Sequence, residues 1–498
     1  MTSTRWLLPS DRDPSSPLGA SVRELAIGLQ DGRWTARQVV DAHLARIEAV
    51  NPTLNAVVRS FSDAARAAAE EVDRARQQGR PLPALAGVPV TVKEMIGLEG
   101  EPITIGSWYR RDLRAQTTAP AVQHWLDAGL IPLGLGNLPE MALWLESNNV
   151  LYGRTVNPWD TRRSAGGSSG GDAAIVAAGG VPAGLGSDLG GSIRVPAALC
   201  GIYGHKPTPS LVSLDGMYPF DGTAPGSDHA FYRAFTSIGP LTRHAEDLGL
   251  LTKVAAGQVD PFDAASLLAD PPHVEDWSGR TVWVHDPDRM RFATPVEAEV
   301  RGAIRALASR LEAAGATVRA WTDETMTEGF RLWLATLGAG STTTLGEAFT
   351  AGQHRRLPIL PELWRRIWPF ARARHTWAAL LTGLAERLAT PNPERLAPAV
   401  EALAGLQSRL FEALGENDIL ISAAFPRSAR RHGWQLFRPT DLAYPGVYSV
   451  LGLPVSVLPA GLDRRGLPIS VQIAAKPGRD EVLFETAVWA EREAGWRR

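Results

Sequence analysis

Two short stretches rich in glycine and serine constrain this sequence more than any other feature. They read AGGSSGGDAA at 165–174 and SDLGGSIRVP at 187–196. Glycine has no Cβ atom, so such stretches let the backbone come close to another group. Between them, residues 171–179 suit a helix of small residues and 181–186 suit a short strand. If that strand runs back along the helix, the two stretches meet in space.

Ser168 and Ser192, one from each stretch, would then be neighbours although they are distant in sequence. The apolar segment LAGVPVTVKEMIGL, at 85–98, reads as a strand that delivers Lys93 at its end. Serine is a poor nucleophile until a base takes its proton. Burial disfavours the charged form of lysine, so a buried Lys93 would serve as that base without a histidine.

Other uses of dense glycine fit this sequence less well. The phosphate-binding string G-x-x-x-x-G-K-[ST] does not occur, and Gly184, Gly186 and Gly190 give a dinucleotide-type spacing that is one residue too long. The string GSSGG at 167–171 matches the nucleophile elbow of α/β-hydrolases, with Ser169 as the nucleophile. That elbow must follow a buried strand, whereas the preceding NPWDTRRSA is polar and typical of turns.

Helical and strand patterns alternate along the chain, which indicates an α/β protein. Helices are predicted over 35–50, 62–79, 118–128 and 294–314, and further strands over 130–135, ATVRAW, LPVSVLPAG and LPISVQIAA. Residues 325–412 differ, because they show several helical patterns and few strand-like runs. We predict that they form a helical insertion that caps the site.

Tryptophans mark one part of this insertion. Trp364, Trp368 and Trp377 lie among arginines in LPELWRRIWPFARARHTWAALL, at 360–381. Such a segment can lie on a membrane surface. Pro369 interrupts it, however, and we favour helices that pack over the pocket, with peripheral membrane contact as the alternative.

Composition argues against several classes of protein. The net charge of the 498 residues is −2, so there is no basic footprint for nucleic acid. A single cysteine, Cys200, excludes an intrachain disulfide, and no apolar run approaches the ~18 residues of a membrane-spanning helix. The histidines form neither an H-E-x-x-H motif nor a cluster with cysteine. We expect a cytoplasmic protein without a metal or another cofactor.

The long string GGSSGGDAAIVAAGGVPAGLGSDLGGSIRVPAALCG, at 166–201, resembles the signature of the amidase signature family. PVTVKE at 89–94 resembles the lysine motif of that family, and GRTVNPWD and GHKPTP resemble flanking motifs. The C-terminal GLPVSVLPAG and GLPISVQIAA also fit. Within the family, LWLESNNVLYGRTVNPWD and GIYGHKP are most similar to the fatty-acid amide hydrolase 2 branch.

The resemblance spans roughly residues 20–495 and is weakest over 325–412. It implies one amidase signature domain over 1–498, with a central mixed β-sheet flanked by helices on both faces. The helical insertion at 325–412 would be part of that domain.

The resemblance also implies a catalytic triad. Ser192 corresponds to the acyl-accepting nucleophile and Lys93 to the base. Ser168 corresponds to the serine that bridges them, and its peptide bond to Gly167 is expected to be cis.

The same resemblance places an oxyanion hole and its support. The hole would be the backbone N–H groups of Leu189, Gly190, Gly191 and Ser192, because small glycines let a substrate carbonyl approach them. We expect Ser169 to order the loop by hydrogen bonding. We expect Asp188 and Arg194 to form an ion pair that pins it.

These features predict an amidase that cleaves carboxamides with an apolar acyl part, or an aryl or alkyl amine part, through an acyl-enzyme. One alternative is the glutaminase (A) subunit of a tRNA-dependent amidotransferase, which works with partner chains. Others are an α/β-hydrolase-type esterase that uses Ser169, and a non-catalytic binding protein on the same fold. The expected partner is a small amide substrate, without nucleic acid, and the sequence leaves open whether the chain forms a homodimer.

Overall fold

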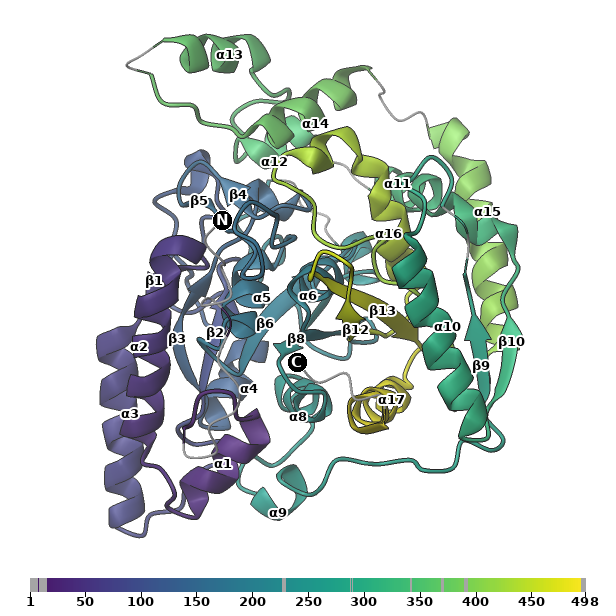
Figure 1. The fold of residues 1–498 in the computed structure, drawn as a ribbon. Helices are drawn as coiled ribbons and strands as arrows, with labels where there is room; N and C mark the ends of the chain where they lie inside the picture. Colours follow the sequence, from purple (N-terminus) through teal and green to yellow (C-terminus); the bar gives the residue numbers. More distant parts are fainter. Residues whose placement is uncertain are drawn as a thin grey trace.

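The computed structural model describes residues 8, 16–225, 230–286, 288, 290–340, 343–368, 371–388 and 393–493. Within these residues one mixed sheet runs through the molecule in the order β1-β3-β2-β6-β8-β7-β12-β13-β11-β9-β10 (Figure 1). Its strands are β1 Val57–Ser60, β2 Pro89–Lys93, β3 Ile131–Gly136, β6 Ala183–Asp188, β7 Tyr203–Lys206, β8 Ser237–Thr242, β9 Thr281–Val284, β10 Thr317–Ala320, β11 Ile419–Ala423, β12 Val455–Leu462 and β13 Pro468–Ala474. Strands β4 Asn148–Asn149 and β5 Gly153–Arg154 form a separate pair.

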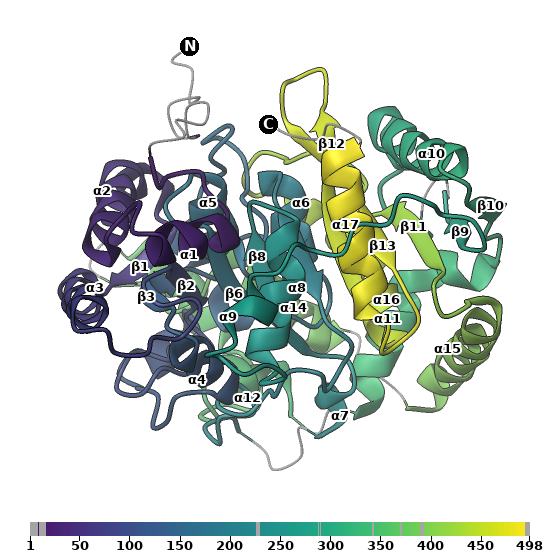
Figure 2. The ribbon, with the colours of Figure 1, turned by 90° about the horizontal axis from the view of Figure 1, so that it is seen from below.

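Helices cover both faces of this sheet, as Figures 1 and 2 show. The α-helices are α1 Val22–Gln30, α2 Ala36–Leu54, α3 Ser62–Gln77, α4 Pro120–Asp127, α5 Gly170–Ala177, α6 Arg194–Cys200, α7 Ala230–Arg233, α8 Glu246–Ala255, α9 Ala264–Leu267, α10 Ala298–Ala313, α11 Gly329–Gly340, α12 Leu345–Phe349, α13 Ile359–Ile367, α14 Trp377–Leu388, α15 Pro393–Ala413, α16 Ala443–Val450 and α17 Asp480–Glu493. Two neighbouring residues of β7 show which helix lies on which face of the sheet. A Cβ on Gly204 would touch Ala197 of α6, whereas His205 hydrogen-bonds Asp480 of α17. Successive residues of a strand point to opposite faces, so α6 and α17 lie on opposite sides of the sheet.

Local signals in the sequence explain several of these elements. Helix α2 begins after Thr35, whose hydroxyl accepts from the backbone N–H of Gln38 in a capping box. The predicted single α/β fold, with a mixed sheet and helices on both faces, is confirmed. Helix α5 is buried along its whole length, which explains its small residues and lack of a polar face.

The candidate site lies where two parallel strands end. Strand β2 pairs in parallel with β3 on one side and β6 on the other, and Val92 of β2 lies opposite Leu185 of β6. Lys93 at the end of β2 is therefore close to the last residues of β6. The glycine-rich loop before α5 reaches the same edge, since Ser169 donates its backbone N–H to the carbonyl of Ser192 at 3.0 Å.

The described residues of 325–412 are mainly helical, and they form two groups. Helices α11 and α15 pack together, and α11 also packs against α16. Helices α12, α13 and α14 form the second group, and α13 projects away from the body in Figure 1. His375, just before α14, hydrogen-bonds the buried Glu140 at 2.6 Å and ties this second group to the main domain.

The close packing of α5 can be tested at Gly171. A Cβ there would lie 2.5 Å from the carbonyl oxygen of Ala56 and closer still to the backbone nitrogen of Asn137. Gly171→Ala should therefore destabilise the protein by about 1–3 kcal/mol, the usual cost of overpacking. The matched control is Gly302→Ala in α10, because Gly302 is exposed and no neighbouring atom would touch an added Cβ, and it should stabilise by about 0.5–1 kcal/mol. Thermal unfolding of both variants measures this, and equal melting temperatures would contradict it.

Candidate active site

Lys93 occupies the centre of the site. Its side chain is fully buried, and its Nζ lies 2.7 Å from Ser168 Oγ and 3.0 Å from Ser187 Oγ. The parallel register of β2 and β6 supplies the second contact, because it sets Ser187 beside the end of β2. The sheet thus holds an amine between two hydroxyl groups, away from water.

Burial controls the charge of this amine. It lowers the pKa of Lys93 to about 7, although the carboxylates of Asp172 and Asp188 raise it in part. Burial also raises the pKa of Asp172 to about 7, against the hydrogen bond from Thr91 and the charge of Lys93, which lower it. Near neutral pH, a neutral lysine is therefore readily available at this position.

The loop before α5 carries Ser168 to Lys93. The peptide bond between Gly167 and Ser168 is cis. A Cβ at Gly167 would lie 2.7 Å from the carbonyl oxygen of Trp144, so glycine is required by the close approach of that segment. Ser147 supports the loop as well, because its hydroxyl donates to the carbonyl of Gly166 and accepts from the N–H of Gly170.

Ser192 is the reachable serine of the site. From Ser164 to Pro207 every residue is buried except Leu189 and Ser192, which are half-buried. Within the described residues, Ser192 Oγ makes no hydrogen bond, so it is not held by Ser168 in this arrangement. Its half-buried hydroxyl thus has no protein partner to displace, and its backbone lies beside the loop that carries Ser168.

The backbone around Ser192 offers hydrogen-bond donors. In the described part of the chain, the N–H groups of Leu189, Gly190 and Ser192 have no acceptor, whereas that of Gly191 donates to Asp188 Oδ1 at 2.7 Å. Of the four N–H groups predicted for the oxyanion hole, three are thus unoccupied and one already holds a carboxylate.

Asp188 and Arg194 form a fully buried, bidentate ion pair. Arg194 Nε and Nη2 each lie 3.0 Å from a carboxylate oxygen of Asp188. Burial alone would raise the pKa of Asp188, but the charge and hydrogen bonds of Arg194 lower it to about 2. The guanidinium also donates to the carbonyl of Pro445 and the hydroxyl of Ser449, which fastens the loop to α16.

Ser169 is buried and contacts the backbone of the neighbouring strand β6. Its side chain is completely buried, and its hydroxyl is 3.4 Å from both the N–H and the carbonyl of Ser187. The residues before it form turns and coil, not a strand. Neither its position nor its burial suits a nucleophile elbow.

Sequence reasoning missed three residues that the structure brings to the site. The register of β2 and β6 brings Ser187 to Lys93. In the sequence, the only sign of this residue was the serine that opens SDLGGS. Asp172 was visible as an acid inside an apolar helix, which marks a buried charge. Trp333, on α11, gave no signal in the sequence. A Cβ at Gly190 would lie 2.9 Å from Trp333 Nε1, and this buried nitrogen has no hydrogen-bond partner in the described part of the chain.

The tryptophans singled out in the sequence lie elsewhere. Trp364 and Trp368 are 57% and 51% exposed and stack on each other with ring centroids 5.2 Å apart. Trp377 is also half exposed and lies under the guanidinium of Arg366. All three rings are thus about half exposed. In the insertion, α11 brings Trp333 beside Gly190.

Metal-binding clusters and membrane-spanning helices are both absent from the described residues. No group of three or more histidine, cysteine, aspartate or glutamate side chains among them is arranged to hold a metal ion. No helix described here has both the length and the apolar content needed to cross a membrane.

Comparisons with known proteins show the family of this chain. A family model described as Amidase matches residues 38–484. Fatty-acid amide hydrolase 2-A of Danio rerio is 35% identical over 96% of this chain and 89% of its own, and the A subunit of glutamyl-tRNA(Gln) amidotransferase from Deinococcus deserti is 33% identical over 93% and 94%. A solved structure described as an amidase is 26% identical, with a TM-score of 0.75 over 95% of this chain and 99% of its own.

The chain therefore belongs to the amidase signature family, and it is an amide-hydrolysing enzyme. The expected likeness to fatty-acid amide hydrolase 2 is confirmed as well. The amidotransferase chain considered as an alternative is also a similar protein, so both remain relevant to the choice of substrate.

Proposed function

We propose that this enzyme hydrolyses carboxamides with an apolar acyl part, or an aryl or alkyl amine part, through an acyl-enzyme on Ser192. The observation that carries the proposal is the buried Lys93 amine, 2.7 Å from the Oγ of Ser168, on a loop that hydrogen-bonds the backbone of Ser192. A buried amine with a pKa of about 7 is a base suited to neutral pH.

The first half of the reaction forms the acyl-enzyme. Neutral Lys93 accepts the proton of Ser168, which in turn accepts the proton of Ser192, and Ser192 Oγ forms a bond to the substrate carbonyl carbon. The N–H groups of Leu189, Gly190 and Ser192 are placed to stabilise the resulting oxyanion. As the C–N bond breaks, the proton held on Lys93 returns through Ser168 to the amine, which leaves neutral.

The second half releases the acid. A water molecule gives one proton to Ser168, Ser168 passes its own proton to neutral Lys93, and the water oxygen attacks the acyl carbon. Collapse of the tetrahedral intermediate breaks the bond to Ser192 Oγ, and Ser192 recovers its proton. The enzyme ends with neutral Lys93, so one water is consumed for each amide cleaved.

The preference for an apolar substrate rests on the insertion and on the relatives. Trp333 places an indole against Gly190, where the substrate carbonyl would bind. Similar proteins are named fatty-acid amide hydrolase 2. The glutaminase chain of an amidotransferase is the second candidate, supported by the likeness to the A subunit of glutamyl-tRNA(Gln) amidotransferase. A panel of amides that includes glutamine separates the two, because only the second candidate favours glutamine and requires partner chains.

The acylated residue can be identified directly. A fluorophosphonate probe should label the protein once, at Ser192, because this is the reachable serine next to the base. Mass spectrometry of the labelled peptide locates the adduct. Ser169→Ala should still be labelled and Ser192→Ala should not. A label on Ser169 would refute this assignment and favour the esterase alternative.

Lys93 should matter more for amides than for activated esters. An amine leaves poorly until it is protonated, whereas a phenoxide leaves without that help, so Lys93→Ala removes an extra contribution from amide cleavage. General acid–base catalysis is worth ~10²–10⁴-fold, so the amide loss should lie in that range and exceed the ester loss. Single-turnover rates for an amide and an ester with one acyl group measure the difference. Equal losses would leave Lys93 as a base but remove its role toward the leaving group.

The pH dependence should report the charge of Lys93. The neutral form is active, so kcat/KM should rise with pH through a midpoint near the pKa of about 7. Ionised Asp172 raises that pKa by attracting the ammonium form, so Asp172→Asn should move the midpoint to lower pH. Asparagine retains an acceptor for the hydroxyl of Thr91, which limits structural damage. A midpoint that stays in place or moves to higher pH would contradict the mechanism.

Trp333 should influence the choice of acyl chain. Trp333→Ala opens space beside Gly190, so the ratio of kcat/KM for long and short acyl amides should change by about tenfold or more. The matched control is Trp364→Ala, because Trp364 is half exposed on α13 and contacts Trp368, and its ratio should stay constant. An unchanged ratio in Trp333→Ala would refute the role of α11. Melting temperatures of both variants check that they fold.

A further inference from the structure

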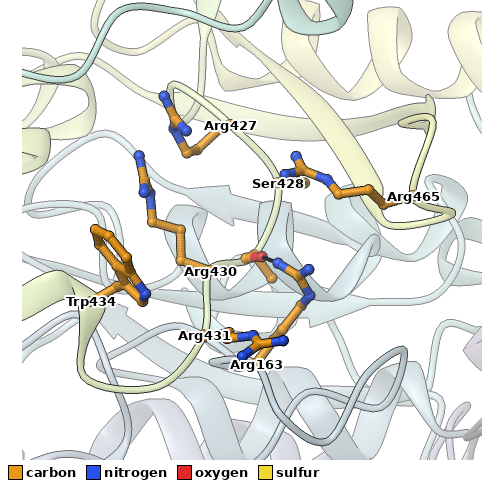
Figure 3. Close-up of a pocket in the computed structure, with 8 residues that line it drawn as sticks. Arg163, Arg427, Ser428, Arg430, Arg431, Trp434 and Arg465 are labelled. Carbon is orange, nitrogen blue, oxygen red and sulfur yellow. Dashed lines mark hydrogen bonds between the residues drawn. The ribbon is translucent and has the colours of Figure 1, made fainter. Parts of the chain in front are cut away.

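A cluster of arginines surrounds a hollow that the amidase reaction does not use. Figure 3 shows this hollow, of about 350 Å³. Three separate segments supply its lining: residue 163, residues 427–434 and residue 465. The arginines are Arg163, Arg427, Arg430, Arg431 and Arg465, with Ser428, Ala429 and Trp434 between them.

The acidic groups around this arginine hollow already have partners. Glu297 is shared by Arg427 at 3.4 Å and Arg465 at 3.2 Å, and Asp463 is bound by Arg465 at 2.8 Å. Asp160 is shared by Arg163 and by Arg162, which lies outside the lining. Asp441 also attracts Arg430, but both of its oxygens accept hydrogen bonds from Thr294.

Two of the five arginines lack a carboxylate partner. Within the described residues, Arg430 and Arg431 have no ion pair, and the guanidinium of Arg430 lies over the ring of Trp434 at 5.4 Å. Among the same described residues, the Nε atoms of Arg427 and Arg430 are buried and have no hydrogen-bond partner. Burial lowers the pKa of Arg430, and the like charges of Arg427 and Arg438 lower it further. Buried N–H donors without an acceptor, surrounded by other positive charges, would be stabilised by a bound anion.

We propose that the arginine hollow binds an oxyanion of the phosphate class, either free phosphate or the phosphate group of a lipid. Planar guanidinium groups donate pairs of parallel hydrogen bonds, which match phosphate oxygens. The surplus of positive charge favours a dianion over a single carboxylate. The volume holds a phosphate and part of a group esterified to it. This site is independent of the amide chemistry at Ser192.

The arginine hollow also adjoins the catalytic loop. Arg430 accepts the N–H of Ser164 on its carbonyl at 2.9 Å, and Arg163 donates to the carbonyl of Ala429 at 2.6 Å. Ser164 lies four residues before Ser168. An occupied hollow would thus stabilise the segment from which the glycine-rich loop starts.

The test uses the whole protein with inorganic phosphate, against sodium chloride of equal ionic strength. Phosphate should raise the melting temperature, and calorimetry should show one site, because a ligand that binds only the folded state stabilises it. The double variant Arg430→Gln/Arg431→Gln should bind at least about tenfold more weakly. Arg464→Gln is the matched control, since Arg464 neighbours Arg465 but is 85% exposed outside the lining.

A second arm distinguishes the two sources of phosphate. Vesicles of phosphatidylcholine with and without phosphatidic acid are sedimented with each variant. Binding that needs phosphatidic acid and both arginines, without a response to free phosphate, supports the site with a lipid phosphate as its source. A response to free phosphate alone supports the free ion. The proposal is overturned if neither is bound, if the double variant responds like the wild type, or if acetate stabilises as well as phosphate. Melting in chloride alone checks that the double variant folds.

Discussion

The buried ion pair between Asp188 and Arg194 holds the candidate site together. Removing two charges from water is costly unless every oxygen and N–H group finds a partner. Here the carboxylate accepts from the guanidinium and from the N–H groups of Gly191, Ile193 and Arg194, and the guanidinium also reaches α16. The loop that carries Ser192 has no regular secondary structure of its own. Electrostatics fixes its shape, and this shape leaves the adjacent N–H groups of Leu189, Gly190 and Ser192 without acceptors.

The same pair influences the charge of Lys93. Asp188 is one of two carboxylates that attract this amine, but Arg194 already occupies both of its oxygens. The other, Asp172, is only partly ionised near pH 7, because burial raises its pKa to about 7. Lys93 therefore has only a partial counter-charge, and desolvation dominates its pKa. The ion pair between Asp188 and Arg194 keeps the loop rigid. Lys93, which has no ion-pair partner in the described residues, loses its proton near pH 7.

The sequence predicted those features that depend on local pattern. Thr35 and the apolar spacing after it predicted helix α2, and the small residues after Gly170 predicted α5. Features that depend on tertiary packing were not predictable. The contact of Ser187 with Lys93 requires the register of β2 and β6, and the neighbourhood of Asp172 requires the rotation of α5 against the sheet. Likewise, the helical patterns of 325–412 indicated helices but not whether Trp364 and Trp368 face the site or the outside.

The serines of the proposed mechanism and the proposed substrate contact come from different parts of the chain. Ser168, Ser192 and the ion pair lie in residues 164–207, which are buried except for Leu189 and Ser192. The wall beside Gly190 comes from α11, in the insertion where the family resemblance is weakest. Trp333 of α11 lies against Gly190, so a change of this side chain acts on the loop from outside the segment that carries Ser168 and Ser192. In the proposed mechanism, α11 is therefore where the preference for the acyl part would be altered.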